Sequence, residues 1–272
     1  MNKFEYHEFC RSLLREAGKD SHKEGYYYQH CNRVYDWLFY FGLFRPLGNL
    51  LDIGPYFSFT PFLLQAHATS VSVLEGDDPA AKPLETMYEK RGIKAIFTDL
   101  NEHFGFVPQA SRRLPYSDAQ FDTILCWETM EHFSFNPVQF VKELRRIATR
   151  NAKLIIIVPD RASIYSVLRM YFGKAQEREI DSLCMTSDYV SNGKYVYHGL
   201  HWREYTRKEL RLLFEKNQFE ILQHGNLQGF YSHQYNASYL PFRLLRKTLF
   251  RISPVFGTDA YVVARPQQIK NA

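Results

Sequence analysis

Three acidic residues each follow or end a short apolar run, which is where a buried strand presents polar groups to a ligand. Asp52 follows Leu50 and Leu51 in the first run, and Glu75 and Asp99 end two later runs. Carboxylates accept hydrogen bonds from hydroxyl and amino groups. Gly54 permits a tight turn and a close approach of the backbone to a ligand. The order of strand, acid, glycine turn and helix predicts a ligand at the carboxyl end of the first strand of a doubly wound sheet.

Histidine side chains supply the candidates for proton transfer, because an imidazole changes charge near neutral pH. His132 follows the fourth predicted strand, and His201 ends a long irregular segment, with Glu204 three residues later. A carboxylate can orient an imidazole, so we predict His201 as a general base and His132 as the second choice. Capping or packing is the structural alternative for both. The spacing His198-x-x-His201-x-x-Glu204 on a non-helical stretch is a weak metal signal, Asp160 has no clear partner, and we predict no metal.

The rest of the chain must position these side chains, and it alternates apolar runs with amphipathic segments. Strands are predicted at 50–53, 71–74, 94–98, 121–127, 153–158, 219–222 and 260–264. Helices are predicted at 3–17, 25–44, 62–67, 80–91, 137–150, 164–172 and 206–216, with a loop at 100–120. The pattern predicts an α/β fold, a Rossmann-like doubly wound sheet of seven strands with mixed direction.

Two segments lie outside that alternation. Residues 1–47 are predicted as a helical N-terminal extension, and 48–272 as the main domain. Residues 161–203 are long, polar and aromatic, and we predict a lid inserted after the fifth strand, because such excursions at the carboxyl end of a sheet usually serve function.

Composition limits the class of protein. The chain has 272 residues, 45% of them hydrophobic and 16% aromatic, with a net charge of +5. This mild basicity allows an anionic partner and demands none. The four cysteines form no Cys-x-x-Cys pair, and the sequence shows neither a signal peptide nor an apolar run of membrane-spanning length. We therefore expect a reducing, cytoplasmic location.

The order of these motifs resembles that of class I S-adenosylmethionine-dependent methyltransferases, in particular the type 11 and type 12 methyltransferase domains. The resemblance extends over roughly 48–160 and continues through 200–225. The stretch from His201 to Thr206 is similar to one common in bacterial members linked to glycan biosynthesis. The motifs concerned are Asp52-x-Gly54, Glu75, Asp99, Leu114-Pro115-Tyr116, Phe121-Asp122 and Glu128-Thr129-Met130-Glu131-His132.

The resemblance implies S-adenosylmethionine as cofactor and assigns roles around it. Glu75, before Gly76, would accept both ribose hydroxyls, and Asp52 would hold the ammonium group directly or through water. Asp99 would accept from the adenine amino group. The full predicted cofactor-binding set is Asp52, Gly54, Tyr56, Glu75, Gly76, Asp99, Leu100 and Trp127, with Leu100 or Trp127 packing on the adenine ring.

The turn after the first strand departs from the family pattern. Tyr56 and Ser58 stand where glycines are usual. A tyrosine there crowds the turn, so either the backbone adjusts or cofactor binding weakens. Gly54 has no glycine partner, which argues against a dehydrogenase with Gly-x-Gly-x-x-Gly.

We predict O-methylation of a sugar, glycan or related small metabolite. One alternative is N-methylation of RNA or a small amine, for which no base is needed. Another is a degenerate fold that binds a ligand or partner without catalysis, which the altered turn would favour.

The stretch 240–251 is basic and amphipathic if helical. It fits either a surface helix packed on the sheet edge or peripheral contact with an anionic membrane or lipid-phosphate-linked substrate. No recognition motif accompanies the charge, which argues against a nucleic-acid partner.

Overall fold

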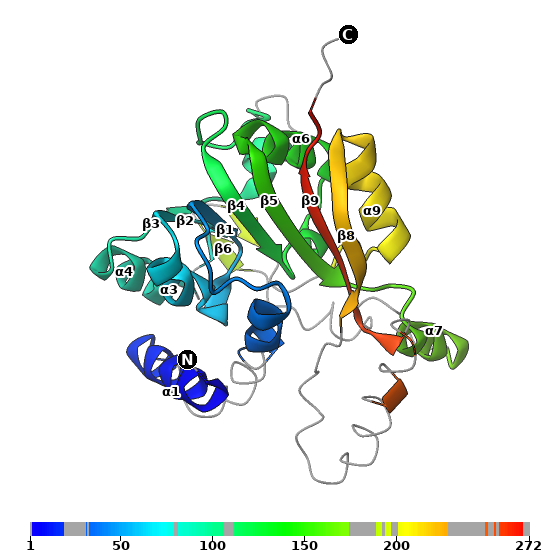
Figure 1. The fold of residues 1–272 in the computed structure, drawn as a ribbon, viewed down its shortest axis with the longest axis horizontal. Helices are drawn as coiled ribbons and strands as arrows, with labels where there is room; N and C mark the ends of the chain where they lie inside the picture. The colour runs from blue at the N-terminus through cyan, green and yellow to red at the C-terminus, as the bar shows by residue number, and fades with distance from the viewer. Residues whose placement is uncertain are drawn as a thin grey trace.

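Seven strands form one mixed sheet in the order β3-β2-β1-β4-β5-β9-β8 (Figure 1). The computed structural model describes residues 2–18, 31, 33–78, 81–105, 111–173, 189–191, 194–196, 201–227, 248–249, 253 and 256–268. The strands are β1 (Asn49–Ile53), β2 (Ser70–Glu75), β3 (Lys94–Phe97), β4 (Phe121–Trp127), β5 (Ala148–Pro159), β8 (Phe219–Leu227) and β9 (Asp259–Pro266). The first five run parallel, whereas β9 is antiparallel to both β5 and β8. The predicted fold class is confirmed.

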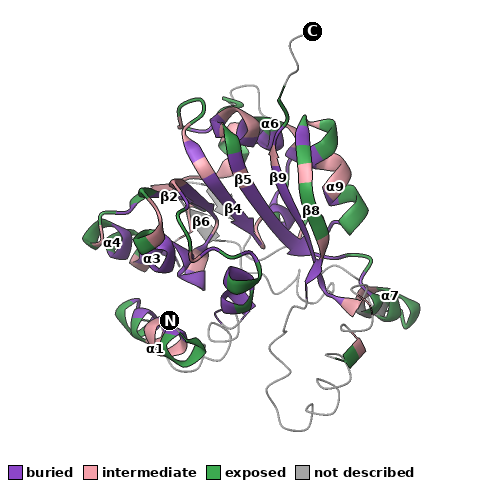
Figure 2. Cartoon of the chain, viewed as in Figure 1, coloured by how far each residue is buried: buried purple, intermediate pink, exposed green. Residues whose placement is uncertain are grey.

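The central strands are mostly apolar toward their carboxyl ends because both of their faces are covered there. Residues 154–158 of β5 are all fully buried, and the later part of this strand is purple (Figure 2). Successive side chains of a strand point to opposite faces. Leu50 therefore packs in one core and Leu51 in the other. A parallel sheet buried in this way needs helices on both faces.

Helices cover the two faces in two separate layers. One core receives side chains from α1 (Lys3–Glu16), the helix at 33–40, α3 (Thr60–Leu64) and α4 (Lys82–Lys90). The other receives side chains from α5 (Leu100–Phe104), α6 (Pro137–Ile147) and α9 (Arg207–Lys216). This arrangement leaves the carboxyl ends of β1 to β5 at one edge of the sheet, where the candidate site lies.

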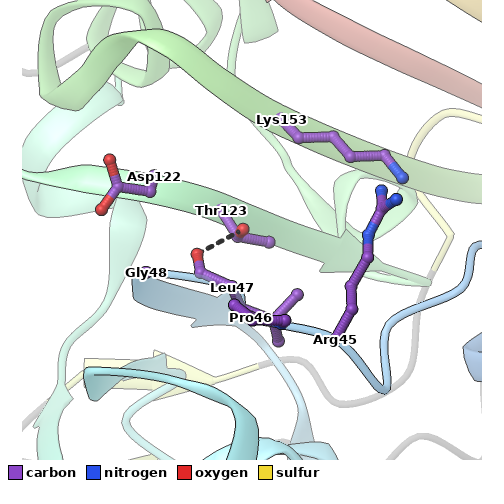
Figure 3. Close-up of a pocket in the computed structure, with 7 residues that line it drawn as sticks. All are labelled: Arg45, Pro46, Leu47, Gly48, Asp122, Thr123 and Lys153. Carbon is purple, nitrogen blue, oxygen red and sulfur yellow. Dashed lines mark hydrogen bonds between the residues drawn. The ribbon is translucent and has the colours of Figure 1, made fainter.

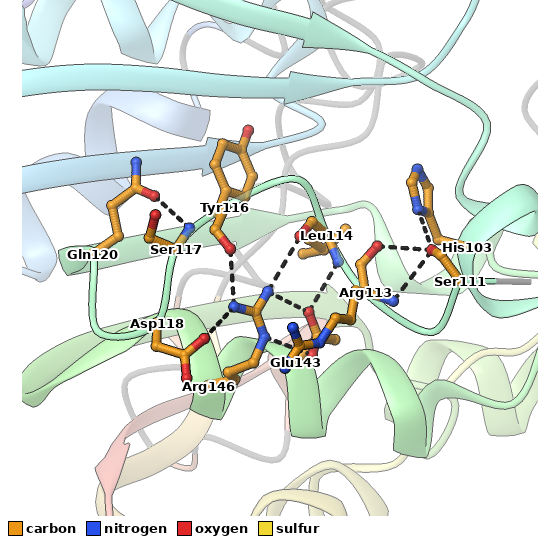
Figure 4. A network of polar contacts seen from close by, with 10 residues as sticks. All are labelled: His103, Ser111, Arg113, Leu114, Tyr116, Ser117, Asp118, Gln120, Glu143 and Arg146. Carbon is orange, nitrogen blue, oxygen red and sulfur yellow. Dashed lines mark hydrogen bonds and ion pairs between the residues drawn. The ribbon is translucent and has the colours of Figure 1, made fainter.

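The segment before β4 is held against α6 by one arginine (Figure 4). Arg146 donates to the carbonyl oxygens of Tyr116 (2.8 Å) and Leu114 (3.2 Å) and pairs with Asp118 at 2.6 Å. Glu143 accepts from the Leu114 backbone N–H at 2.9 Å and pairs with Arg146 at 2.7 Å. The neighbouring carboxylates raise the pKa of Arg146, so the guanidinium stays charged. This network fixes the entry into β4 and hence the register of its carboxyl end.

Several predicted boundaries are corrected. Residues 100–104 form α5, not loop, because the Asp99 side chain caps this short helix by accepting from Asn101 N–H at 2.9 Å. Helix α6 ends at Ile147 instead of at Arg150, and β5 starts at Ala148 instead of at Lys153. Strand β8 extends to Leu227, past the predicted 222, with an irregularity between Ile221 and Gln223. Polar side chains on its outer face hide that length from a search for apolar runs.

The predicted lid region contains α7 (Ile164–Tyr171) and a two-stranded pair, β6 (Tyr189–Ser191) with β7 (Lys194–Val196). Most apolar side chains of α7 are exposed (Figure 2). His198 and most of 240–251 lie outside the described residues, as do 25–30 of the predicted second helix. A lid role for 161–203 and the membrane contact of 240–251 stay predictions. None of the described helices is long and apolar enough to span a bilayer.

Candidate active site

Asp52 lies at the centre of the sheet, beside Val73 of β2 and Leu125 of β4. Its buried carboxylate accepts a hydrogen bond from the hydroxyl of Thr60, the first residue of α3. Burial raises the pKa of Asp52 to about 7, and the bond from Thr60 opposes that rise. Asp52 thus ties the start of α3 to β1, and its contact with an ammonium group stays a prediction.

The turn after β1 bends through three residues with positive φ. Gly54 has φ +65°, and a Cβ added there would lie 2.5 Å from Thr129 Oγ1. Tyr56 (φ 44°) and Phe59 (φ 58°) adopt the same left-handed region, which costs a residue with a side chain about 1–2 kcal/mol. The backbone at Tyr56 therefore adopts the conformation that glycine would favour, and its ring packs edge-on against Phe57 at 4.5 Å. Of the two predicted outcomes for this turn, the structure shows the adjusted backbone.

Glu75 at the end of β2 connects to that turn. Its Oε2 accepts from Tyr56 N–H at 2.8 Å, and its Oε1 accepts from Gly76 N–H at 3.1 Å. Burial raises the pKa of Glu75 to about 8, while these two N–H groups oppose the rise. An ionised carboxylate offers about four lone-pair sites. The two backbone bonds therefore leave acceptor capacity for two hydroxyls.

Asp99 and Leu100 form the start of α5 beyond β3. Asp99 Oδ1 accepts from both the backbone N–H and the side-chain amide of Asn101, each at 2.9 Å. Leu100 is half-buried and packs against the core that contains α6. The structure therefore assigns Asp99 a capping role, and its contact with adenine stays a prediction.

The end of β4 lies against the helix at 33–40. Trp127 is buried and packs edge-on to Trp37, with ring centroids 5.7 Å apart. Arg33 lies over the Trp37 ring at 4.8 Å and pairs with Glu128 at 2.5 Å. Glu128 itself has φ 53°, which turns its side chain sharply after the strand. The N-terminal extension thus takes part in the site, and packing of Trp127 on adenine stays a prediction.

Glu131, which sequence reasoning placed only within a motif, proves to be the most unusual carboxylate of the site. It lies in the short 3-10 helix η4 (Met130–His132) and is 1% exposed. Within the described residues neither of its carboxylate oxygens has a hydrogen-bond partner. Burial and the charge of Glu128 raise the pKa of Glu131, and Arg33 opposes them. The acids of 128–132 were visible in the sequence, but their burial and the pairing with Arg33 were not.

The two predicted histidines meet beside Glu131. The rings of His132 and His201 are 4.9 Å apart and nearly perpendicular. His201 Nδ1 lies 3.1 Å from Glu204 Oε1, as predicted from their spacing. The backbone N–H groups of Trp202 and Arg203 donate to the Glu131 carbonyl oxygen at 2.8 and 3.2 Å, which docks 201–204 on η4. Ligand atoms of Glu131, His132 and His201 all lie within 4.8 Å of one another.

Asp160, at the end of β5, is engaged elsewhere. Its carboxylate accepts from the side-chain amide of Asn226 and, at 2.9 Å, from Ala162 N–H. Burial raises its pKa. Asp160 thus joins β5 to β8 and is occupied by these bonds.

A hollow lies at the opposite edge of the sheet from these residues (Figure 3). It measures about 440 Å³ and is lined by 45–48, Asp122, Thr123 and Lys153. Lys153 donates to the Phe41 carbonyl oxygen at 3.2 Å, and burial and the charge of Arg45 lower its pKa. Because this hollow faces the amino ends of the strands, it is separate from the candidate active site.

The fold is that of the class I S-adenosylmethionine-dependent methyltransferases. An S-adenosylmethionine-dependent methyltransferase of Thermotoga maritima aligns with a TM-score of 0.53 at 16% identity, over 96% of this chain and 99% of that one. A second, from Mesorhizobium loti, has a TM-score of 0.53 at 11% identity, over 85% and 97%. A protein of Pyrococcus horikoshii has a TM-score of 0.51 at 14% identity, over 86% and 88%. At these identities the likeness concerns the fold alone.

A family described as a methyltransferase domain matches residues 1–224, and the chain belongs to this family. Membership of this family makes the chain a methyltransferase, an enzyme. One stretch of 97 residues is 32% identical to an uncharacterized protein of Methanocaldococcus jannaschii. That match takes in 36% of this chain and 40% of the length of the curated relative.

The cofactor is S-adenosylmethionine. Its ribose diol needs two hydrogen-bond acceptors, and Glu75 keeps that capacity after bonding Tyr56 and Gly76. Gly54, with no Cβ, lets the chain turn at the end of β1 while Thr129 packs where a side chain would lie. The residues present therefore fit the cofactor.

Proposed function

We propose that the enzyme methylates a hydroxyl group of a sugar, a glycan or a related small metabolite. The observation that supports this most directly is the pair of His132 and His201 beside the end of β4, with Glu204 on His201 Nδ1. Hydroxyl acceptors gain from a general base, whereas an unprotonated amine does not need one. An oriented imidazole at this edge of the sheet is the feature that such a base requires.

Each residue of the site has a proposed task. When bound, S-adenosylmethionine supplies a methyl group on a positively charged sulfonium. Glu204 accepts from His201 Nδ1–H, which fixes the tautomer and leaves Nε2 to take the proton of the acceptor hydroxyl. His132 binds and orients that hydroxyl within about 3–3.5 Å of the reacting carbon.

The cofactor contacts are also part of this proposal. Glu75 holds the ribose, and Asp52 holds the ammonium group of the methionine end, directly or through water. Asp99 receives the adenine amino group with its remaining acceptor capacity, while Leu100 or Trp127 contacts the ring. Gly54, Tyr56 and Gly76 contribute backbone along the same edge of the sheet.

The acceptor class rests on the resemblance of 201–206 to members linked to glycan biosynthesis. A lipid-linked acceptor would also suit the basic stretch 240–251 and its predicted membrane contact. N-methylation of a small amine is the second candidate, since the Thermotoga maritima neighbour carries the name "possible histamine N-methyltransferase". The acids at Glu128 and Glu131 would attract an amine as well.

Transfer of a labelled methyl group to a panel of acceptors tests the proposal. Nucleotide sugars, lipid-linked glycans, small amines and tRNA form the panel. We expect a hydroxyl acceptor to be labelled and His201→Ala to lower turnover roughly 10²- to 10⁴-fold, with cofactor affinity almost unchanged. His224→Ala, an exposed histidine on β8, is the matched control.

A labelled amine, together with normal turnover in His201→Ala, would contradict O-methylation and favour the second candidate. Labelling of tRNA with strong salt dependence would point to RNA instead.

A further inference from the structure

We propose that Glu131, His132 and His201 form a binding site for a divalent transition-metal ion, best matched by Zn²⁺. Two imidazole nitrogens and one carboxylate oxygen are a known ligand set for Zn²⁺ sites that keep a position open for water or substrate. The ligand atoms of these residues lie within 4.8 Å of one another. The inference adds to the proposed function, because it gives the acceptor hydroxyl a second means of activation at the same place.

The unpartnered carboxylate of Glu131 is the first argument for a cation. A buried carboxylate without hydrogen bonds is costly unless a charge or a proton compensates it. Glu131 is 1% exposed and finds no such bond within the described residues. Glu128 and Asp259 add negative charge nearby, and Arg33 is the cation that acts against them. The balance of charge around Glu131 therefore favours a further positive ion.

The arrangement of His201 is the second and independent argument. Metal-binding histidines usually donate their other ring N–H to a carboxylate, which fixes the ring. Glu204 Oε1 lies 3.1 Å from His201 Nδ1 and is itself nearly buried. This contact leaves Nε2 of His201 as the ligating nitrogen. The backbone N–H groups of Trp202 and Arg203 bond the Glu131 carbonyl oxygen, so His201 is fixed next to Glu131.

The separation of the three ligand atoms and the exposure of the two histidines are compatible with metal binding after small side-chain rotations. Zn–N and Zn–O bonds of about 2.0–2.2 Å place tetrahedral ligands roughly 3.3–3.6 Å apart. The present limit of 4.8 Å requires small side-chain rotations, and these are available because His132 is exposed and His201 half-buried. The same exposure gives the ion a path of entry.

The ion would serve the transfer by acidifying the acceptor, as zinc acidifies bound water. The acceptor O–H bond breaks and its proton passes to solvent. The oxygen then forms a bond to the methyl carbon, and the S–C bond of the sulfonium breaks with its electron pair left on sulfur. In the metal-bound enzyme, His201 thus acts as a ligand and the ion takes over the activation of the hydroxyl.

Metal titration of the full chain tests this site without any acceptor. Zn²⁺ is titrated calorimetrically into chelator-treated protein, and Co²⁺ is titrated with detection of its visible absorption. We expect one equivalent to bind, and Glu131→Gln, His132→Gln and His201→Ala each to weaken binding at least 100-fold. Glu204→Gln should weaken it 10- to 100-fold through the orientation of His201. His224→Ala should bind as the parent does.

The variant His132→Gln separates loss of metal binding from misfolding, because this side chain is exposed and its replacement leaves the core intact. Absence of binding at micromolar Zn²⁺ and Co²⁺ by the folded parent would overturn the site, as would binding that survives both histidine substitutions. Methyl transfer with and without chelator separates the two proposals. Unchanged transfer by the metal-free enzyme overturns the role of the ion in activating the hydroxyl and keeps the histidine base. Intact metal binding without any hydroxyl methylation supports the site and contradicts the proposed function.

Discussion

Glu75 is the residue on which the cofactor assignment depends most. It accepts from two backbone N–H groups, and we propose that it also accepts two ribose hydroxyls. Glu75→Ala should weaken S-adenosylmethionine binding by about 1.5–3 kcal/mol, the range for hydrogen bonds to a charged group. Calorimetric titration measures this, with Glu89→Ala on the exposed side of α4 as the control.

Loss of Glu75 also frees the turn at Tyr56, so a second variant is needed. Glu75→Gln keeps an acceptor for Tyr56 N–H, removes the charge and replaces the oxygen that faces Gly76 N–H by an amide NH2. If a folded Glu75→Ala protein binds the cofactor as tightly as the parent, the ribose role is excluded.

Gly54 offers a test of the turn itself. Gly54→Ala would place a Cβ 2.5 Å from Thr129 Oγ1, whose hydroxyl contacts the Ile53 and Trp127 carbonyl oxygens at 3.1 and 3.0 Å. We expect the free energy of unfolding to fall by about 2–4 kcal/mol, from left-handed backbone strain plus the clash. Urea denaturation measures this change.

Gly92→Ala is the matched control, because Gly92 has φ +66° and no atom within 4 Å of an added Cβ. The Gly92→Ala variant should lose only the contribution of left-handed backbone strain, about 1–2 kcal/mol of the free energy of unfolding. Equal losses in the two variants would show that Thr129 moves aside without cost.

Among the elements, the helix at 33–40 is the one that connects the N-terminal extension to the chemistry. Arg33 pairs with Glu128 at 2.5 Å, and both side chains are largely buried. Arg33→Met would leave that carboxylate without its cation, and breaking a buried pair costs about 3–5 kcal/mol. We expect a loss of this size in urea denaturation, and partial recovery in Arg33→Met with Glu128→Gln.

Lys3 and Asp36 make a comparable but exposed pair at 2.7 Å in the same extension. Lys3→Met should change stability by less than about 1 kcal/mol. A loss in Arg33→Met no greater than that of Lys3→Met would show that the pair at the site is not structural.

Sequence patterns predicted the helices and strands better than they predicted the contacts between them. Runs such as 154–157 identify a strand buried on both faces, because no polar residue interrupts them. Helix α5 was not predicted because its five residues are too few to show a helical period. Asp99, a favourable N-cap residue, could have indicated its start. The 3-10 helix η4 and the contacts of Arg33 depend on packing between segments far apart in the chain, which no local pattern encodes.

The candidate site divides in the same way. Asp52, Glu75 and Asp99 could be found because strand ends are visible in the sequence. The approach of His132 to His201 joins β4 to a segment almost 70 residues later, and only their residue types suggested it. The positive φ of Tyr56 could not be predicted, because the sequence rule expects glycine there.

At the scale of the whole molecule, the buried carboxyls of Asp52 and Glu75 link stability to pH. Burial raises their pKa values to about 7 and about 8, and the charge of Asp52 adds to the rise at Glu75. The folded protein therefore binds more protons than the unfolded chain at pH values between the ordinary carboxyl pKa and these raised values. By linkage, the free energy of unfolding must fall as pH rises through that window, by up to about 1.4 kcal/mol per pH unit for each group.

Urea denaturation of the cofactor-free protein between pH 5.5 and 8.5 measures this slope. Glu75→Gln cannot lose a proton and should make the slope shallower, with the part due to Asp52 remaining. Glu220→Gln, which removes an exposed carboxylate paired with Arg265, should leave the slope unchanged. Saturating S-adenosylmethionine should also flatten the slope, because ribose hydroxyls that bond the ionised Glu75 lower its pKa. Stability that rises from pH 5.5 to 8.5 in the parent would show that these carboxyls are ionised in the folded protein, and the same decline in Glu75→Gln would show this for Glu75. Their charges would then already be compensated before the cofactor binds.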